Sequence, residues 1–365
     1  MNKRDAYLWL KSIDKVTDKV ITSIQENGIE IEKLMDYSNK EILEIKNINL
    51  NIKENIVKYK SHEYLDKIKG NINKTKTNYI CIEDKNYPKN LKNIYNPPKI
   101  LFYKGNIDII NENINIAMVG ARKCTQYGSN CAKKIGKELS EYDINIISGL
   151  AIGIDYYSHI GCLEGSSKAV AILGSPVDNI LPRTNLKLAD KILEDGGVII
   201  SEFYTNDKVY PSNFVQRNRI ISGISDGIVV VEAAKKSGSL ITVDYGLEQG
   251  KNIFAVPGNI NSCMSEGCHN IIKLGAKLIN NVEDILEEYN IMNSIKQNNE
   301  INKLNELSPQ QKLIINEIKN KGTLNIDEIC DNTNINIKNM NVIINELIIN
   351  DLIIENDNNN YSLNT

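Results

Sequence analysis

Arginine is rare in this sequence and unevenly placed. Only five of the 43 basic residues are arginines: Arg4, Arg122, Arg183, Arg217 and Arg219. Because lysine supplies the general positive charge, a retained arginine indicates a position that needs a planar guanidinium, for instance to bind phosphate through two hydrogen bonds. Four of these arginines and 18 of the 22 glycines lie in residues 120–275. Since glycine lets the backbone turn sharply or approach a ligand closely, we expect the chemistry of the protein there.

The first candidate site is the turn Gly120-Ala121-Arg122-Lys123, which follows an apolar run and precedes a helix expected from about Thr125. A tight glycine turn lets the amides of a helix N-terminus face an anion, and Arg122 adds a directed cation. Short patterns of this kind are common, so an ordinary strand-to-helix turn with a solvent-exposed arginine is the alternative.

The most specific stretch is 212–223, which reads SNFVQRNRIISG at the start of a helix. It places Asn213, Phe214, Arg217, Asn218 and Arg219 close together. The two arginines are two residues apart and cannot share one helix face. We expect one to hold phosphate and the other to brace the fold against a carboxylate such as Glu202 or Glu232. Phe214 either stacks on a nucleic-acid base or belongs to the core.

A second glycine-hydroxyl turn, Ser237-Gly238-Ser239, opens another helix and is a plausible anion nest. Lys235 and Lys236 precede it, and Lys251 follows. Two turns suited to phosphate on neighbouring strands fit either a polynucleotide backbone or a single nucleotide.

Other chemistry is less well supported. The segment 148–155 is not the G-x-G-x-x-G of dinucleotide enzymes. Asp155 and His159 are one helical turn apart and form either an acid-base pair or a helix N-terminus stabilised by aspartate. Cys263, Cys268 and His269 lack a fourth ligand at a zinc-like spacing, so we expect no metal and no other cofactor.

The elements that position these turns alternate between apolar runs and amphipathic helices. The expected strands are INIAMVG, INIISG, KAVAILG, GVIISE, GIVVVEA, NIFAVPG and an edge strand AKLIN, preceded by two strands in 79–105. Continuous apolar strands separated by helices predict a parallel sheet covered on both faces. The fold class is therefore α/β, with a doubly wound, mostly parallel, extended Rossmann sheet over 76–290. Ligands bind such sheets beyond the carboxyl ends of the strands.

The two ends of the chain predict smaller domains. Residues 1–75 predict a small helical domain of the SAM or helix-hairpin-helix type, with Ser38 and Glu41 forming a capping box. Because 45–56 has no glycine for a DNA-binding hairpin, a packing or docking role is favoured. The polar segment 291–307 predicts a linker, and 308–365 predicts a winged-helix domain of three helices and a two-stranded wing.

The charge balance excludes binding of nucleic acid by bulk charge. The net charge is −3, distributed as +2 over 1–75, −1 over 76–290 and −4 over 291–365. The acidic C-terminal domain suits a protein partner better than duplex DNA. Seven cysteines without a C-x-x-C pair, a start without the apolar region of a signal peptide and no long apolar stretch predict a cytoplasmic protein that does not bind membranes.

Several long motifs, in this order and spacing, resemble the DNA-processing protein A family (DprA/Smf). They are VGARKCTQYG, SGLAIGID, QRNRIISGIS, VVVEAAKKSGSLIT, FAVPG and SEGCHNIIKLGA. The likeness runs over about 79–285 and is weaker at both ends. It implies a single-stranded DNA-binding protein that is not an enzyme, protects incoming DNA in natural transformation, helps to load the RecA recombinase and forms homodimers.

Together with the turns above, the resemblance gives a predicted DNA-binding set. It comprises Gly120, Ala121, Arg122, Lys123, Asn213, Phe214, Arg217, Asn218, Arg219, Ser237, Gly238, Ser239 and Lys251. Family members often have serine at the position of Ala121 and arginine at the position of Lys251. Alanine here removes a possible hydroxyl contact, and lysine here weakens bidentate phosphate binding without removing the charge.

Two other functions compete with this one. A nucleotide-processing enzyme of the lysine-decarboxylase-like phosphoribohydrolase type would use Glu232 or Glu202 as acid-base residue, but the P-G-G-x-G-T-x-x-E run of that class is absent from SGSLITVDY. A winged-helix transcription regulator would bind a particular duplex, which the −4 charge of the C-terminal segment disfavours. Natural transformation and general recombination stay open as alternative settings.

Overall fold

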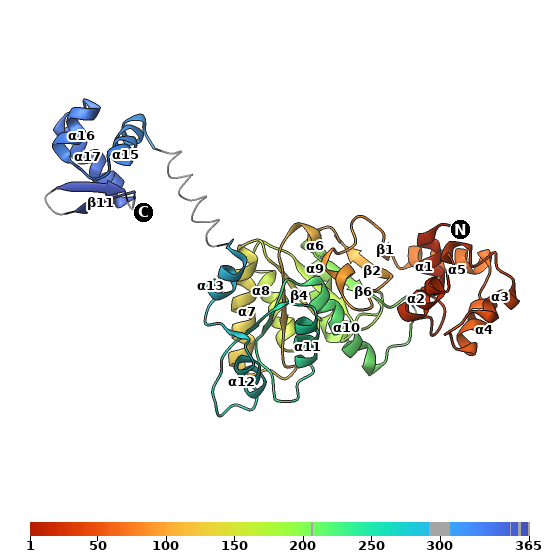
Figure 1. The fold of residues 1–365 in the computed structure, drawn as a ribbon. Helices are drawn as coiled ribbons and strands as arrows, with labels where there is room; N and C mark the ends of the chain where they lie inside the picture. The colour runs from red at the N-terminus through yellow and green to blue at the C-terminus, as the bar shows by residue number, and fades with distance from the viewer. Residues whose placement is uncertain (206, 292–306, 351, 357–358, 364–365) are drawn as a thin grey trace. The chain divides into compact units, whose positions relative to one another are not determined.

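A nine-stranded β-sheet forms the centre of the larger of two compact units in the computed structural model (Figure 1). The structure describes residues 1–205, 207–291, 307–350, 352–356 and 359–363. The two units are Met1–Ile285 and Leu286–Thr365. Most of the predicted linker, residues 292–306, lies outside the described residues.

The strands of the sheet follow the order β1-β2-β6-β5-β4-β3-β7-β8-β9. Their bounds are β1 (Asn78–Cys81), β2 (Ile100–Gly105), β3 (Asn115–Val119), β4 (Asn145–Ser148), β5 (Ala169–Leu173), β6 (Val198–Ser201), β7 (Gly227–Val230), β8 (Asn252–Ala255) and β9 (Lys277–Leu278). The strands from β3 to β9 pair in parallel, whereas β2 pairs antiparallel with β6 and β1 antiparallel with β2. The predicted fold class, a mostly parallel α/β sheet, is confirmed, and every apolar run contains a strand.

Helices cover both faces of this sheet, and all residues of the central strands β3 to β7 are therefore buried. The helices between β3 and β6 are α7 (Gln126–Glu141), α8 (Ile154–Cys162) and α9 (Leu186–Glu194), and those after β6 are α10 (Pro211–Ile224), α11 (Leu240–Glu248) and α12 (Glu266–Lys273). From β3 to β6 the chain adds strands toward one edge of the sheet, and from β7 to β9 it adds them toward the other edge. Because crossovers between parallel strands are right-handed, the helices of the first series and those of the second lie on opposite faces. The direction changes between β3 and β7, and this switch point is where such sheets bind ligands.

Short elements complete the connections of the first unit. They are η2 (Asn90–Asn93), α6 (Ile109–Glu112), η3 (Arg183–Asn185) and, at the boundary with the second unit, α13 (Glu283–Leu286) and η4 (Glu287–Tyr289). None of the described helices has both the length and the apolar character needed to cross a membrane.

Five helices and one helical turn precede the sheet, and we call them the N-terminal module. They are α1 (Lys3–Lys11), α2 (Asp18–Glu26), η1 (Ile31–Lys33), α3 (Asn39–Glu44), α4 (Leu50–Lys58) and α5 (His62–Lys74). The predicted capping box of Ser38 and Glu41 is confirmed at the start of α3. Tyr7 and Trp9 are buried in α1 together with Leu8 and Leu10, because α1 is central to the module.

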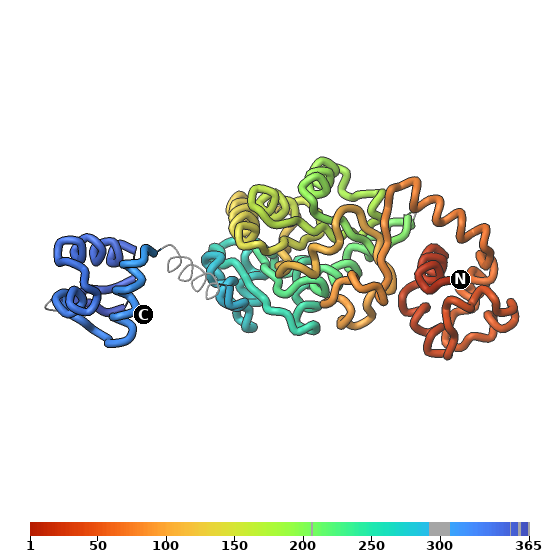
Figure 2. The backbone as a smooth tube through the Cα atoms, turned by 90° about the horizontal axis from the view of Figure 1, so that it is seen from above, coloured from red at the N-terminus to blue at the C-terminus, as the bar shows by residue number. Residues whose placement is uncertain are grey.

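The N-terminal module packs against the antiparallel edge of the sheet, as Figures 1 and 2 both show for α1 and the β1–β2 hairpin. Tyr7 Oη donates to Glu83 Oε1 at 2.7 Å, and the backbone N–H of Lys99 donates to Asp18 Oδ1 at 2.9 Å. Both contacts are compatible with the predicted docking role, and the predicted domain boundary at residue 75 stays a prediction.

The second unit contains three helices and a small three-stranded sheet. Its elements are α15 (Pro309–Lys321), β10 (Leu324–Asn325), α16 (Ile326–Thr333), α17 (Ile337–Ile349), β11 (Ile353–Asn356) and β12 (Asn360–Leu363). Buried isoleucines and leucines from all three helices form its core. The expected helices and terminal hairpin are present, and the winged-helix class remains our interpretation of them.

Candidate functional site

A cavity of about 740 Å³ opens beyond the carboxyl ends of the central strands. The segments that follow β3, β4, β5, β6 and β7 all contribute to its lining, so the cavity lies at the switch point of the sheet. The sequence predicted a site at this edge.

The turn after β3 presents Arg122 to this cavity. The Arg122 side chain is exposed, and its guanidinium carbon lies 6.0 Å from the centre of the Phe214 ring, within cation–π range. In the part of the chain that the structure describes, no carboxylate forms an ion pair with Arg122. Its charge is therefore available to a ligand, beside an aromatic ring that is only half-buried.

Glu232, which follows β7, holds this turn in place. The N–H of Ala121 donates to the Glu232 backbone carbonyl at 2.7 Å. The Glu232 carboxylate accepts bonds from Thr125 N at 2.8 Å and Thr125 Oγ1 at 2.6 Å, and Thr125 in turn caps α7, which begins at Gln126. A Cβ atom on Gly128 would lie 2.2 Å from this carboxylate, so a larger residue there would have to displace Glu232 from its bonds to Thr125. Glu232 is an anchor beneath the turn and does not line the cavity.

The loop after β4 packs directly against the first turn. Gly153 has a φ of +83°, and a Cβ atom there would lie 2.3 Å from the Ala121 carbonyl oxygen. Leu150 has a φ of +54°, and Asn185 donates to its carbonyl at 3.0 Å. Gly153 therefore allows the close approach of the two loops, whereas Gly149 leaves room for the guanidinium of Arg217.

Arg217 forms part of the cavity wall but is largely engaged within the protein. It is 5% exposed, and its Nη1 donates to the carbonyls of Ile172 and, at 2.9 Å, of Gly149. Burial lowers the pKa of Arg217 to about 10, so it stays charged at neutral pH. Because its donors reach two strand-end carbonyls, Arg217 joins β4 and β5 below the cavity and adds positive potential to it.

Asp155 and His159 do not form the acid-base pair that their spacing allowed. Asp155 Oδ2 accepts the N–H groups of Gly149 at 3.1 Å and Ala151 at 3.3 Å, so it closes the loop at the start of α8. Burial raises the pKa of Asp155, against the opposing charge of Arg217. His159 is fully buried, and burial together with Arg217 lowers its pKa to about 3. His159 is therefore neutral at physiological pH, and neither nitrogen contacts Asp155.

The turn after β7 supplies hydroxyls to the same cavity. Ser237 Oγ and Ser239 Oγ lie 2.8 Å apart, and Asn218 Nδ2 donates to the Gly238 carbonyl at 3.4 Å. This bond joins the turn to α10. The cavity therefore combines an exposed arginine, a half-buried aromatic ring and hydroxyls at a helix start, which suits a chain of phosphates and bases.

The structure brings together eight of the thirteen predicted site residues. Those that line the cavity are Gly120, Arg122, Phe214, Arg217, Asn218, Ser237, Gly238 and Ser239. Ala121, Lys123 and Asn213 belong to the same segments but do not line it. Ala121 and Asn213 are buried, and Lys123 is exposed next to Arg122.

Two predicted residues, Arg219 and Lys251, lie outside this cavity, and their contact with DNA stays a prediction. Arg219 is on the face of α10 opposite Arg217, where its Nη2 pairs with Glu202 Oε2 at 2.5 Å. This is the bracing role foreseen for one of the two arginines. Lys251 precedes β8 and so lies at the amino ends of the strands, away from the cavity. Burial lowers its pKa.

Sequence reasoning missed the wall formed by Val209, Tyr210 and Pro211. Tyr210 is 55% exposed and precedes the proline that starts α10. The Tyr-Pro pair directly before a helix with two arginines is the sequence signal that would have identified a second aromatic residue beside Phe214.

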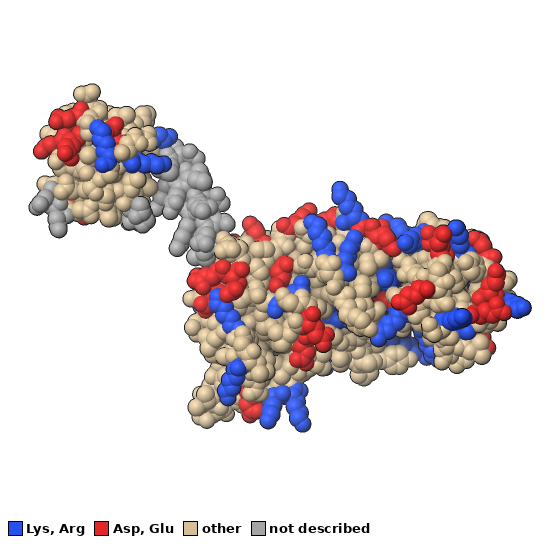
Figure 3. Space-filling model, in the orientation of Figure 1, with Lys and Arg blue, Asp and Glu red and all other residues tan. Residues whose placement is uncertain are grey.

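The surface shown in Figure 3 mixes blue and red side chains over both units rather than gathering one sign into a patch. This agrees with the balanced charge of the sequence and favours a local site. No group of three or more metal-binding side chains occurs among the residues that the structure describes.

Comparisons with known sequences converge on one family. The model described as DNA recombination-mediator protein A matches residues 78–290. The DNA processing protein DprA of Streptococcus pneumoniae is 39% identical over 210 residues, which are 58% of this chain and 73% of the relative. The Bacillus subtilis protein of the same name is 40% identical over 211 residues, 58% of this chain and 71% of the relative.

Solved structures agree with the sequence relatives. The X-ray structure of DprA from Streptococcus pneumoniae matches with a TM-score of 0.61 at 32% identity, over 74% of this chain and 98% of that one. DNA processing protein A from Helicobacter pylori matches with a TM-score of 0.53 at 25% identity, over 61% of this chain and 98% of that one. The Helicobacter structure is described in terms of a unique single-stranded DNA binding mode of that protein.

Proposed function

Since the chain belongs to the DNA recombination-mediator protein A family, we propose that it binds single-stranded DNA in the cavity at the carboxyl ends of β3 to β7. The observation that supports this most is the pairing of an exposed, unpaired Arg122 with the half-buried ring of Phe214 in that cavity. A cation beside an aromatic face suits a nucleotide strand, which offers a phosphate and a base together.

Each wall of the cavity has a distinct role in this proposal. Arg122 neutralises a phosphate, while the hydroxyls and backbone of 237–239 contact the neighbouring one. Phe214, and Tyr210 at the rim, stack on bases without reading their identity. Arg217 provides positive potential from below while it holds Gly149 in place. Binding is then independent of sequence and limited to a few nucleotides.

We propose the remaining roles on the strength of the family resemblance. The protein loads the RecA recombinase onto the bound strand, protects that strand, acts as a homodimer in the cytoplasm and has no enzymatic activity of its own. The candidate carboxylates of the competing phosphoribohydrolase function disfavour that function, because Glu202 is paired with Arg219 and Glu232 with Thr125.

Equilibrium binding of a fluorescent oligo-dT tests the site directly. We expect salt-sensitive binding, much weaker binding to duplex of equal length, and a loss of about 1.5 to 3 kcal/mol in Arg122→Ala, as for a charged hydrogen bond. Lys123→Ala is the matched control, since Lys123 is exposed next to Arg122 but does not line the cavity. Equal affinity for duplex, or equal losses in both variants, would refute the proposed site.

A further inference from the structure

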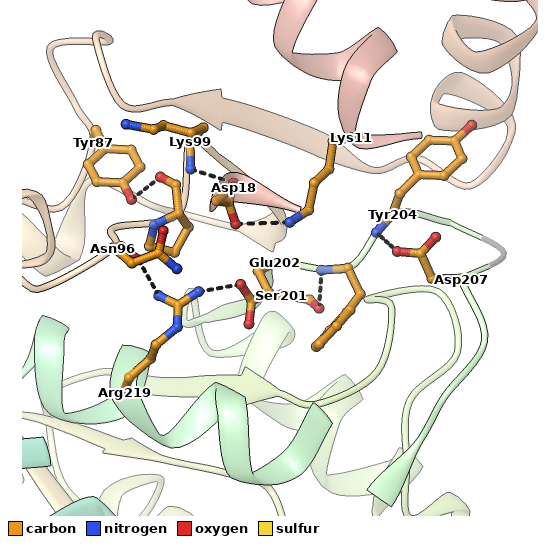
Figure 4. Close-up of polar contacts among 12 residues, drawn as sticks. Lys11, Asp18, Tyr87, Asn96, Lys99, Ser201, Glu202, Tyr204, Asp207 and Arg219 are labelled. Carbon is orange, nitrogen blue, oxygen red and sulfur yellow. Dashed lines mark hydrogen bonds and ion pairs between the residues drawn. The ribbon is translucent and has the colours of Figure 1, made fainter. Parts of the chain in front are cut away.

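A second cluster of charged residues lies at the junction of the N-terminal module with the sheet (Figure 4). Lys11 Nζ at the end of α1 pairs with Asp18 Oδ2 at the start of α2, at 3.0 Å, and their side chains are 8% and 3% exposed. Arg219 Nη2 on α10 pairs with Glu202 Oε2, and these side chains are 8% and 0% exposed. Buried charges are costly to desolvate, so this cluster needs an explanation.

The two ion pairs belong to one electrostatic group. Burial lowers the pKa of Lys11, but Asp18 and Glu202 outweigh it, and the net shift is upward. Asp207 contributes a further favourable charge to Lys11. Glu202 Oε1 has no hydrogen-bond partner among the described residues. The N-terminal module thus places a buried cation within the electrostatic reach of the carboxylates beyond β6.

Backbone contacts join the same partners across the junction. Asp18 Oδ1 accepts the N–H of Lys99, immediately before β2, and Arg219 Nη1 donates to the Asn96 carbonyl at 3.1 Å. Asp207 Oδ2 accepts the N–H of Tyr204 at 2.8 Å. The cluster therefore fixes the start of β2, helix α10 and the segment after β6 together.

The elements held by this cluster also form the cavity. Residues 209–211 continue directly from Asp207 and line the cavity wall. Helix α10 carries Phe214, Arg217 and Asn218 on its cavity side and Arg219 on the other. A rotation or shift of α10 allowed by a loosened junction would therefore displace the aromatic and basic groups of the site.

We propose that the N-terminal module is a positioning element of the DNA site, with Lys11 as the positioning residue that acts through Asp18, the segment 96–99 and Arg219 on helix α10. This rests on the proposed function of the cavity. It assigns to the helical module a task that needs no contact with DNA, in keeping with its lack of a hairpin glycine in 45–56.

The test compares Lys11→Met with Lys3→Met in the full chain. Both substitutions remove one positive charge from α1, but Lys3 pairs with Glu83 at the surface, where the side chains are 43% and 44% exposed. We expect Lys11→Met to weaken oligo-dT binding roughly tenfold and to accelerate amide hydrogen exchange in 203–224. Lys3→Met leaves both unchanged, and Lys11→Arg restores most of the affinity.

The dependence of affinity on salt separates positioning from direct contact. A residue that contacts phosphate changes the slope of log affinity against log salt by about 0.7 when it is removed. We expect Arg122→Ala to show this change and Lys11→Met to keep the wild-type slope. A reduced slope in Lys11→Met would overturn the proposal, because Lys11 would then contact DNA itself.

A milder variant keeps the test decisive if Lys11→Met does not fold. Tyr204 Oη donates to the Ile68 carbonyl of α5 and accepts from Asn71, both at 3.4 Å, and the ring packs edge-on against Phe102. Tyr204→Phe removes only the two hydrogen bonds of the hydroxyl group and keeps the ring packing, and we expect a two- to threefold loss of affinity, of the order of one weak hydrogen bond. Folded Lys11→Met or Tyr204→Phe protein with wild-type affinity refutes the positioning role. Wild-type protein that does not bind oligo-dT refutes the proposed function instead.

Discussion

The two faces of α10 differ in what their arginines do. Toward the cavity, Arg217 donates to two backbone carbonyls and to the Asn218 side-chain amide oxygen, and exposed Arg122 has no carboxylate partner among the described residues. Toward the N-terminal module, Arg219 and Lys11 are each paired with a buried carboxylate. Among the described residues, the arginines of the cavity form no ion pair, whereas the cations on the other face are each paired directly.

Under the proposed function, the difference explains how a protein with a net charge of −3 would hold an anionic polymer. A few cations that point into one cavity without carboxylate partners create a local positive potential, whatever the total charge. The paired cations contribute rigidity, because removing one member of a buried pair leaves an uncompensated charge. The following substitutions test this division, in order of decreasing expected effect.

Glu202→Gln gives the largest expected change. It leaves Arg219 buried without a counter-charge, so the free energy of unfolding should fall by about 3 to 5 kcal/mol in urea titrations. The control is Asp195→Asn, which removes the partner of Lys168 in a pair whose side chains are 39% and 34% exposed, and which should cost at most about 1 kcal/mol. Equal losses in the free energy of unfolding would show that the buried ion pair at the junction contributes no more than an exposed surface pair.

Phe214→Ala tests the opposite face of α10. Loss of a stacking surface should weaken oligo-dT binding by about 1 to 3 kcal/mol, as measured by fluorescence anisotropy. Tyr95→Ala is a suitable control, because Tyr95 is 86% exposed but does not line the cavity. If affinity is unchanged in Phe214→Ala, this residue serves the core, which is the alternative that the sequence left open.

The fold was predictable in detail because each strand is an apolar run that ends at a turn. The runs INIAMVG and KAVAILG, for instance, contain β3 and β5 almost residue for residue. Covering by helices on both faces requires such runs, so local sequence and tertiary structure agree. The loops at the strand ends could be predicted for the same reason, since parallel strands bring them to one edge.

The site was predictable only in part, because residues that are close in the sequence can point their side chains in different directions. Arg217 and Arg219 were recognised as having different roles, but only the helix orientation shows that Arg219 faces Glu202. Lys251 was included through resemblance, although it precedes β8 at the amino ends of the strands and does not line the cavity. The ion pair of Lys11 with Asp18 joins residues only seven apart, but its burial could not be foreseen, because it depends on packing of the module against the sheet.

Asp207 provides a smaller, pH-dependent test of the junction. Burial raises its pKa to about 6, with further contributions from Asp14 and Asp178. The folded state then retains a proton that the unfolded chain has lost, so between about pH 4 and pH 6 stability falls as pH rises. Asp207→Asn should remove this decline and stabilise the protein by about 1 kcal/mol above pH 6, because partial exposure screens the effect. Urea titrations at pH 4.5 and pH 7.5 measure it, and a parallel decline in the variant would contradict the assignment.

Lys251→Met has the smallest expected effect on DNA binding. It tests whether motif resemblance or position in the structure better predicts which residues contact DNA. Motif resemblance places Lys251 among the DNA contacts, whereas the structure places it at the amino ends of the strands, partly buried and nearest to the charge of Asp226. We therefore expect oligo-dT affinity and its salt slope to match the wild type, in contrast to Arg122→Ala. A slope reduced by about 0.7 would show that the strand reaches the far edge of the sheet, and that the uncompensated charge extends beyond the cavity.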